Sequence, residues 1–272
     1  MVANEMFLDS SSLRSSAVSH AKMLGYEVTS ARAPKAIVNI NLTTGDATKT
    51  LAAGTAFTTT VDGVNYQFVT TSDRTAANSG NVVTFDSVDI YEGTYVIGKS
   101  IVDTSNPDQK FTLSDPSADA STLTVKVQNS TSDTTTTTYT KATDITQLSA
   151  SSTVYYLQEI ERGRFEVYFG DGVVSKALTN GNIVILQYVV TNKGAANGVT
   201  SFTATTSIDG ATDIVVTTVS GAVGGAEPES VDSIKLNAPL NYSAQGRAVT
   251  TSDYEVYVKR LFPTTQSVSI WG

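Results

Sequence analysis

The sequence contains no cysteine and only one histidine, His20. The absence of cysteine excludes disulfides, thiolate metal sites and cysteine nucleophiles. A transition-metal site or a Ser-His-Asp triad would have to be built around His20 alone, and no nucleophile-elbow motif is present. We therefore interpret His20 as structural and expect no enzymatic activity, no metal site and no cofactor.

Charge is scarce as well, at 16% of residues, and its balance is acidic, with a net charge of -8 and a pI of about 4.6. An acidic chain poor in lysine is a weak candidate for binding a phosphate backbone, so we expect no nucleic-acid partner. No apolar run approaches the ~18 residues of a membrane-spanning helix, and the first residues lack the pattern of a signal peptide. We expect a soluble protein, assembled in the cytoplasm, without membrane contact of its own.

Threonine, serine and valine dominate residues 35–225, and their period there is two, as in strands. A hairpin turn is predicted at 61–64, and an exposed hairpin tip or mobile loop at 130–138. The predicted strands are 37–42, 82–85, 94–101, 123–127, 154–159, 164–169, 182–191, 199–205 and 213–218. No repeat of fixed period is present, so the pattern favours one or two antiparallel β-sandwich-like domains rather than a solenoid or propeller.

Residues 1–34 form a separate N-terminal helical segment in this interpretation. Asp9 or Ser10 is the predicted N-cap, and Gly25 is placed to end the helix. Its narrow apolar stripe suits either a partner surface or the core of its own domain, and the sequence leaves both open. The stripe consists of Leu13, Ala17, Ala21 and Leu24.

A second change of period, from two to 3.6, begins near residue 226 and marks a C-terminal module, 226–272. Pro228 suits the first turn of a helix and Pro239 is predicted to end it. Val231, Ile234 and Ala238 lie on one face of this predicted helix.

A second helix of this module is predicted from a cap at Thr250, with Asp253 as the capping-box partner. Pro263 is expected to end it, and residues 266–271 alternate like a strand. Its predicted buried face consists of Tyr254, Tyr257, Val258 and Leu261 at positions i, i+3, i+4 and i+7.

Three acidic loop residues, Asp115, Asp119 and Asp171, could in principle ligate calcium, but the ligand spacing of an EF-hand is absent. Turn roles are favoured, above all for Gly170, Asp171 and Gly172, where a tight turn needs residues that tolerate positive φ. Arg247 lies between the two C-terminal helices and is predicted either to pair across an interface or to be a solvated loop residue.

The C-terminal module resembles the baseplate J-like family, the wedge proteins of contractile-tailed phage baseplates. The resemblance is carried by GGAEPESVDSIKLNAP (224–239) and QGRAVTTSDYE (245–255). Upstream, FEVYFGDGVVSKALTNGNIVILQYVVTNKGAANGV (165–199), AGTAFTTTVDGVNYQFVT (53–70) and FTLSDPSADASTLTVKV (111–127) fit as well. The opening FLDSSSLRSSAVSHAKMLGYEVTSARAP (7–34) is similar to the segment before the β-domain in wedge proteins of T-even-like and cyanophage-type myoviruses.

The resemblance implies a structural subunit of the virion tail that forms rings of wedges around the tail hub. Implied partners are a second copy of the chain, other wedge proteins, and sheath-initiating and hub-proximal baseplate proteins. Family members of the T-even-like type continue beyond this point, so we expect the module to continue past 272 in the longer protein. The alternative is a surface or fibre β-sandwich that binds glycans, although a free-standing glycan-binding sandwich does not need the helical C-terminus.

Overall fold

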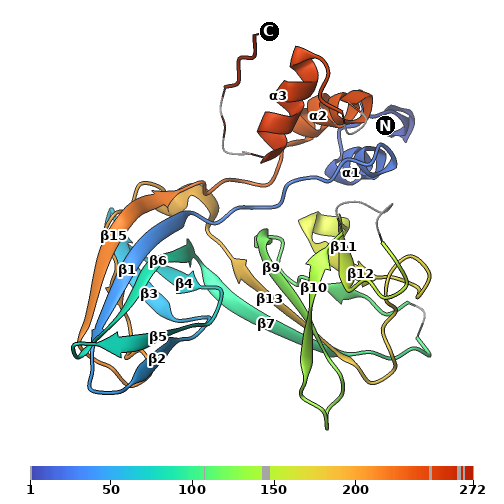
Figure 1. Cartoon of the computed structure of the whole chain (residues 1–272). Helices are drawn as coiled ribbons and strands as arrows, with labels where there is room; N and C mark the ends of the chain where they lie inside the picture. The colour runs from blue at the N-terminus through green and yellow to red at the C-terminus, as the bar shows by residue number, and fades with distance from the viewer. Residues whose placement is uncertain are drawn as a thin grey trace. The chain divides into compact units, whose positions relative to one another are not determined.

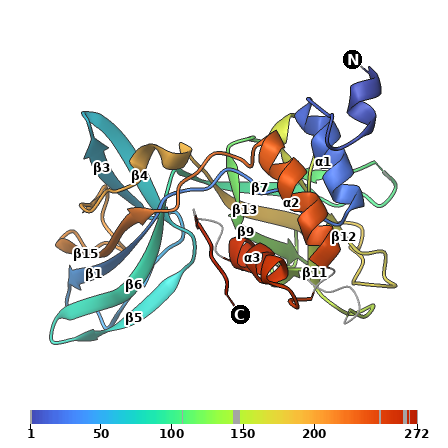
Figure 2. The same ribbon diagram turned by 90° about the horizontal axis from the view of Figure 1, so that it is seen from above.

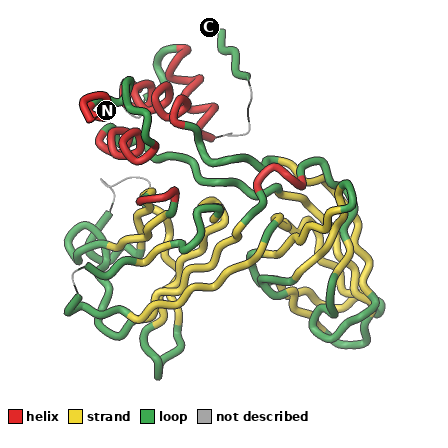
Figure 3. The backbone as a smooth tube through the Cα atoms, turned by 180° about the vertical axis from the view of Figure 1, so that it is seen from behind, coloured by secondary structure: helices red, strands yellow, loops and turns green. Residues whose placement is uncertain are grey.

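The computed structural model describes residues 2–106, 108–142, 148–244, 247–261, 265 and 267–271 (Figure 1). The chain divides into two compact units. The helical unit comprises Met1–Thr29, Glu159–Gly163 and Pro228–Gly272, and the β unit comprises Ser30–Gln158 and Arg164–Glu227. The described α-helices all lie in the helical unit. The colouring by secondary structure shows that the β unit consists mostly of strands and loops (Figure 3).

The first sheet of the β unit has the strand order β14-β3-β4-β6-β1-β15, with β2 paired to β5 and β5 also paired to β6. Its pairs are antiparallel, and the 61–64 hairpin joins β3 to β4 as predicted. The strands are β1 (Lys35–Thr43), β2 (Thr48–Leu51), β3 (Ala56–Val61), β4 (Val64–Thr70), β5 (Arg74–Ser79), β6 (Val82–Glu92), β14 (Thr203–Ala204) and β15 (Ile214–Val223).

The core of this sheet follows from strict alternation, which β1 illustrates: Val38, Ile40 and Leu42 are fully buried and their neighbours are not. Phe57 and Phe68 fill the centre with them, and the Phe68 ring meets the Phe202 ring edge to face at 4.8 Å. Because each such aliphatic or aromatic side chain contributes roughly 1.5–3 kcal/mol when buried, this core is the main stabilising element of the β unit.

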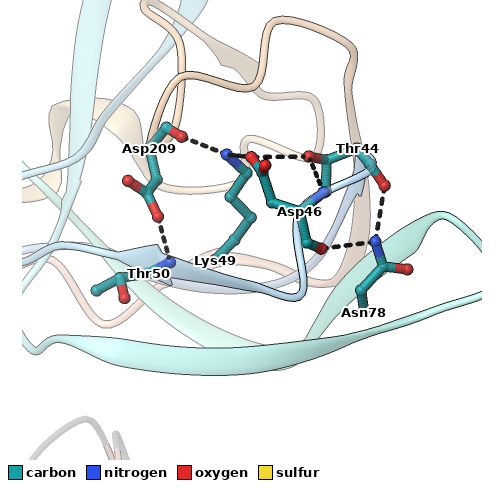
Figure 4. Close-up of polar contacts among 6 residues, drawn as sticks. All are labelled: Thr44, Asp46, Lys49, Thr50, Asn78 and Asp209. Atoms are coloured by element: carbon teal, nitrogen blue, oxygen red, sulfur yellow. Dashed lines mark hydrogen bonds and ion pairs between the residues drawn. The ribbon is translucent and has the colours of Figure 1, made fainter.

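A buried lysine closes one end of the first sheet (Figure 4). The Lys49 side chain is 7% exposed, and its ammonium donates to the Asp209 carbonyl at 2.6 Å and pairs with the Asp46 carboxylate at 2.5 Å. Asp209 also accepts from the Thr50 amide at 2.9 Å, and the Asn78 amide donates to the carbonyls of Thr44 and Asp46. These bonds satisfy a charge that would be costly to bury alone, and they join the loop at 209 to β2.

The second sheet has the order β7-β13-β9-β10-β11-β12-β8, and its only parallel pair among the described strands is β10 with β11. Its core includes Val125, Val184, Leu186 and Tyr188. The strands are β7 (Thr94–Ile101), β8 (Phe111–Thr112), β9 (Ala118–Gln128), β10 (Thr136–Lys141), β11 (Val154–Glu159), β12 (Phe165–Phe169) and β13 (Ile183–Val190). The short helices η3 (Glu161–Gly163) and η4 (Lys193–Ala196) follow β11 and β13.

The second sheet is an insertion into the first. The chain leaves β6 through Gly93 to start β7 and returns at the end of β13, where Thr94 and Val190 are direct partners in the β7–β13 ladder. Gly93 has φ 125°, and a Cβ there would lie 2.2 Å from the Val190 carbonyl oxygen. Only glycine therefore fits the crossing between the sheets.

A buried carboxylate fixes the same crossing. Glu92 is fully buried and accepts hydrogen bonds from the Thr191 hydroxyl at 2.6 Å, the Asn192 amide nitrogen at 2.9 Å and the Asn192 side chain at 2.8 Å. These three hydrogen bonds satisfy the buried carboxylate and hold the end of β6 to the residues that follow β13.

The two segments that join the units run antiparallel to each other. Arg32 and Ala226 exchange backbone hydrogen bonds of 2.9 and 3.1 Å, and the Glu229 amide donates to the Thr29 carbonyl at 3.0 Å. The register is that of the Lys35–Val223 pair, where β1 meets β15.

The predicted fold class, mainly β with an N-terminal helix and a C-terminal two-helix module, is confirmed. Three details of the prediction were wrong. Residues 199–205 form only the two-residue β14, because Val199 and Phe202 are both buried and a spacing of three does not alternate. The described residues 267–271 form no strand, and no other described strand pairs with them. The helix predicted to end at Pro239 runs on as α2 (Val231–Ala244).

The continuation of α2 through Pro239 has a packing explanation. Proline inside a helix costs about 3 kcal/mol because it removes one backbone hydrogen bond. Ala238 and Ala244, on either side of Pro239, are buried, and α2 contacts both α1 (Arg14–Met23) and α3 (Thr251–Leu261). Tertiary packing on both sides outweighs the local penalty.

Candidate assembly surface

The two alanines of the predicted apolar stripe on helix α1 are buried within the chain. Ala17 and Ala21 are fully buried, and α1 packs against α2 beside it (Figure 2). Leu13, just before the helix, is 49% exposed, and Leu24, just after it, is partly buried. The stripe thus consists of two buried alanines, the partly buried Leu24 and the exposed Leu13.

The cap of α1 differs from the prediction. The helix begins at Arg14, after Asp9 and Ser10, and its N-cap residue Leu13 offers no side-chain hydrogen bond. The Glu5 carboxylate supplies the cap from outside, accepting from the Ser12 amide at 2.9 Å, the Ser12 hydroxyl at 2.7 Å and the Leu13 amide at 3.2 Å. These bonds, the Ser12 hydroxyl first among them, lower the pKa of Glu5 to about 2.

Helix α2 has one buried face and one exposed apolar face. The Ser230 hydroxyl oxygen caps the helix by accepting from the Ser233 amide at 3.2 Å. The helix therefore starts at Val231, after Pro228 and not at it. On the inner face Ile234 is fully buried and Val231 partly so. The opposite face, which the sequence interpretation missed, carries Leu236 and Leu240, four residues apart, at 61% and 38% exposure, and Tyr242 near the end of the helix is 57% exposed. Their spacing gave the signal, because apolar residues on more than one face of a helix indicate burial on more than one side.

Helix α3 is capped as predicted. The Asp253 carboxylate accepts from the amides of Thr250 and Val249 at 2.8 and 3.0 Å, and the Asp253 amide donates to the Thr250 hydroxyl at 3.2 Å. The same bonds, led by that from the Thr250 backbone, lower the pKa of Asp253. The predicted buried face of α3 was wrong at Tyr254, which is 49% exposed, and Tyr257 and Val258 are only partly buried.

The remaining predicted residues near α3 lie at its two ends. Leu261 is the last residue of the helix, and Pro263, its predicted stop, lies outside the described residues. Arg247 is exposed, its amide donates to the Ala244 carbonyl at 2.8 Å, and its charge contributes to the lowered pKa of Asp253. Arg247 therefore lies close to the α3 cap.

An ion pair joins α1 to the turn at 159–163. Arg14 forms a two-pronged pair with Glu159, with nitrogen–oxygen distances of 2.7 and 2.8 Å, and also donates to the Glu229 carbonyl. The Glu229 carboxylate accepts from the Tyr26 hydroxyl at 2.8 Å and the Ser233 hydroxyl at 2.7 Å. The N-terminal segment, the 159–163 turn and the start of α2 are thus fixed to one another by charge-assisted hydrogen bonds.

The helical unit exposes more apolar surface than its size explains. It holds less than a third of the chain but more than half of the exposed large hydrophobic side chains found among the described residues. These are Met6, Phe7, Leu13, Met23, Leu236, Leu240, Tyr242, Val249, Tyr254 and Trp271. Exposed apolar residues gathered in one unit are typical of protein–protein contact.

The predicted turn at Gly170–Gly172 lies in the β unit, after β12. The Asp171 carboxylate accepts from the Val173 amide at 2.9 Å, a bond that lowers the pKa of Asp171. Gly172 has φ 89°, and a Cβ on Gly170 would lie 1.9 Å from the Ser175 hydroxyl oxygen. The arrangement is a local turn whose glycines are needed by the backbone.

The other candidates for chemistry have structural partners. A ring nitrogen of His20 lies 2.9 Å from the Glu5 carbonyl oxygen. Asp115 accepts from the Ser117 amide, and buried Asp119 accepts from the amides of Ala33 and Ser121. Among the described residues no group of three or more metal-ligating side chains occurs, and no helix is long and apolar enough to span a membrane.

This chain is similar in sequence to proteins of known baseplates. Residues 99–200 match the family model of the third domain of the bacteriophage baseplate wedge protein gp6. Baseplate wedge protein gp6 of Enterobacteria phage T4 is 27% identical over 95% of this chain. The chain spans 42% of that relative's length. A chain in the cryo-EM structure of the anti-feeding prophage (AFP) baseplate aligns with a TM-score of 0.34 and 14% identity, covering 90% of this chain and 46% of that one.

The matched residues 99–200 contain β8 to β13, nearly the whole second sheet. Both sequence matches are to baseplate wedge proteins, and they confirm the resemblance of the sequence to baseplate wedge proteins.

Proposed function

We propose that this chain is a non-enzymatic structural subunit of a phage tail baseplate wedge. The observation that carries the proposal is the alignment of 95% of the chain with a baseplate wedge protein. In the proposal, wedges form a ring around the tail hub and rearrange when the sheath contracts. The chain is assembled into the virion in the host cytoplasm, beside a second copy of itself, other wedge proteins and sheath-initiating and hub-proximal proteins.

The helical unit is the proposed assembly end. Its exposed apolar residues on α2 and α3, Leu236, Tyr242 and Tyr254 among them, would be removed from water in a wedge. At roughly 25 cal/mol per Å² of apolar area, a few such side chains already stabilise a contact by several kcal/mol. The proposed contact set also includes Leu13, Val231, Arg247, Tyr257, Val258 and Leu261, whereas Ala17, Ala21 and Ile234 would act by holding α1 and α2 together.

Wedge assembly from purified proteins tests the proposal. The double change Tyr257→Asp and Val258→Asp is expected to abolish the wedge peak in sedimentation velocity while the β unit stays folded. Because both side chains are partly buried, the single changes Leu236→Asp and Tyr254→Asp serve as variants that leave the packing of the unit intact. Val64→Asp, at a 53% exposed site in the β unit, is the matched control. Wedge formation by all of these variants would contradict the proposed assembly end.

A further inference from the structure

One face of the second sheet is apolar, basic and open. Strand register places Ile185 of β13 directly between Lys99 of β7 and Lys126 of β9, and pairs Ile183 with Ile101. We call this the isoleucine–lysine face, formed by Ile97, Lys99, Ile101, Lys126, Ile183 and Ile185.

The exposure of this face distinguishes it from the opposite one. Ile97 and Ile101 are 51% and 58% exposed, whereas Val125, Val184 and Leu186 on the other face are at most 5% exposed. Ile185 is 7% exposed although its face is open, which we attribute to the aliphatic stems of the lysines on either side of it. The face therefore has an apolar centre flanked by two ammonium groups.

Neither lysine has an ion-pair partner in the described part of the chain. The four strands β7, β9, β10 and β13 carry one carboxylate, Asp119, which is buried and lies toward the opposite end of β9. Two unpaired positive charges on an apolar face stand out in a chain of net charge -8.

A lysine on an edge strand often serves only to prevent edge-to-edge pairing. That explanation fits Lys99 on β7, the edge strand, but not Lys126, because β9 lies between β13 and β10. A partner whose carboxylates face both lysines accounts for the two together.

We propose that the isoleucine–lysine face docks a polypeptide segment in which aliphatic side chains alternate with carboxylates. The aliphatic side chains cover Ile97, Ile101 and Ile183, and the carboxylates pair with Lys99 and Lys126. That the segment belongs to another subunit of the particle rests on the proposed function, but the binding chemistry does not.

Fluorescence polarisation with two labelled peptides tests the docking. The full chain is expected to bind the acidic peptide VDIEVDI and not the charge-reversed peptide VKIKVKI, with affinity falling as salt rises. Lys99→Glu with Lys126→Glu should weaken binding about tenfold or more, since two favourable pairs become repulsive. Lys176→Glu, at an exposed site off this face, is the control for net charge.

Two further variants test whether any loss of peptide binding comes from the face itself and not from disturbed folding. Because Lys126 is half-buried, Ile97→Ser and Ile101→Ser test the face without touching the interior, and each should also weaken binding. Equal binding of both peptides, or of neither, overturns the proposal. Sedimentation that shows the chain self-associating, and losing that association in Lys99→Glu, overturns it in favour of a second copy as occupant. Peptide binding by a chain that still fails to form wedges separates this inference from the proposed function, which alone would then fail.

Discussion

Replacing Glu159 by leucine removes the acceptor of the two-pronged pair with Arg14 and leaves a guanidinium in a partly buried site. The Glu159 side chain is 2% exposed and the Arg14 side chain 29% exposed. Breaking a fully buried pair costs about 3–5 kcal/mol, because the remaining charge is desolvated without a partner. Because Arg14 is partly exposed, we expect Glu159→Leu to cost near the lower end of this range, about 3 kcal/mol. The equilibrium constant for opening the helical unit should then rise roughly a hundredfold.

Native-state amide exchange in α1, followed across low urea concentrations, measures that opening in the full chain. Glu161→Gln, an exposed carboxyl in the same turn, is the matched control and should change the exchange free energy by less than about 0.5 kcal/mol. The double variant Arg14→Met with Glu159→Leu should recover much of the loss, since an apolar pair replaces an ionic one. If Glu159→Leu behaves like Glu161→Gln, the pair does not hold α1 in place and the reasoning is refuted.

Two further predictions concern local geometry. Gly93→Ala should lower the free energy of unfolding by about 2–4 kcal/mol in urea titrations, because its Cβ meets the Val190 carbonyl at a positive φ, whereas Gly45→Ala, with open space around it, should be near neutral. Glu5 has its pKa lowered from 4.5 to about 2 in the folded chain, so its stabilising bonds are fully present above pH 4.5 and are lost as pH falls toward 2. Amide exchange at Ser12 and Leu13 should accelerate over that range, and Glu5→Gln should remove the pH dependence; an unchanged profile in the variant would contradict the cap.

The features that the sequence predicted are those decided by neighbouring residues. The alternation in 37–42 predicted β1 because each buried side chain is two residues from the next. The capping box of Thr250 and Asp253 was readable since its partners are three residues apart.

The features that the sequence did not predict depend on residues distant in the chain. β5 was missed because its residues are mostly polar, and it forms by pairing with β2 and β6. The cap of α1 comes from Glu5, seven residues before Ser12, and no local motif encodes that distance. The Arg14–Glu159 pair joins residues 145 positions apart, so only the folded chain brings them together.

The antiparallel connection between the units has a mechanical consequence. A pull that separates α1 from α2 first loads the packing of the two helices and the bonds of Arg14 and Tyr26 to Glu229. It then loads the Thr29–Glu229 contact, the Arg32–Ala226 bonds and finally the β1–β15 ladder, so the bonds of the connection would rupture one at a time at low force. A pull on both helices in the same direction tensions the two segments in parallel, and every cross-connection is then sheared at once. The connection would therefore resist a peeling force weakly and a shearing force strongly, so its mechanical strength would depend on the direction of the applied load.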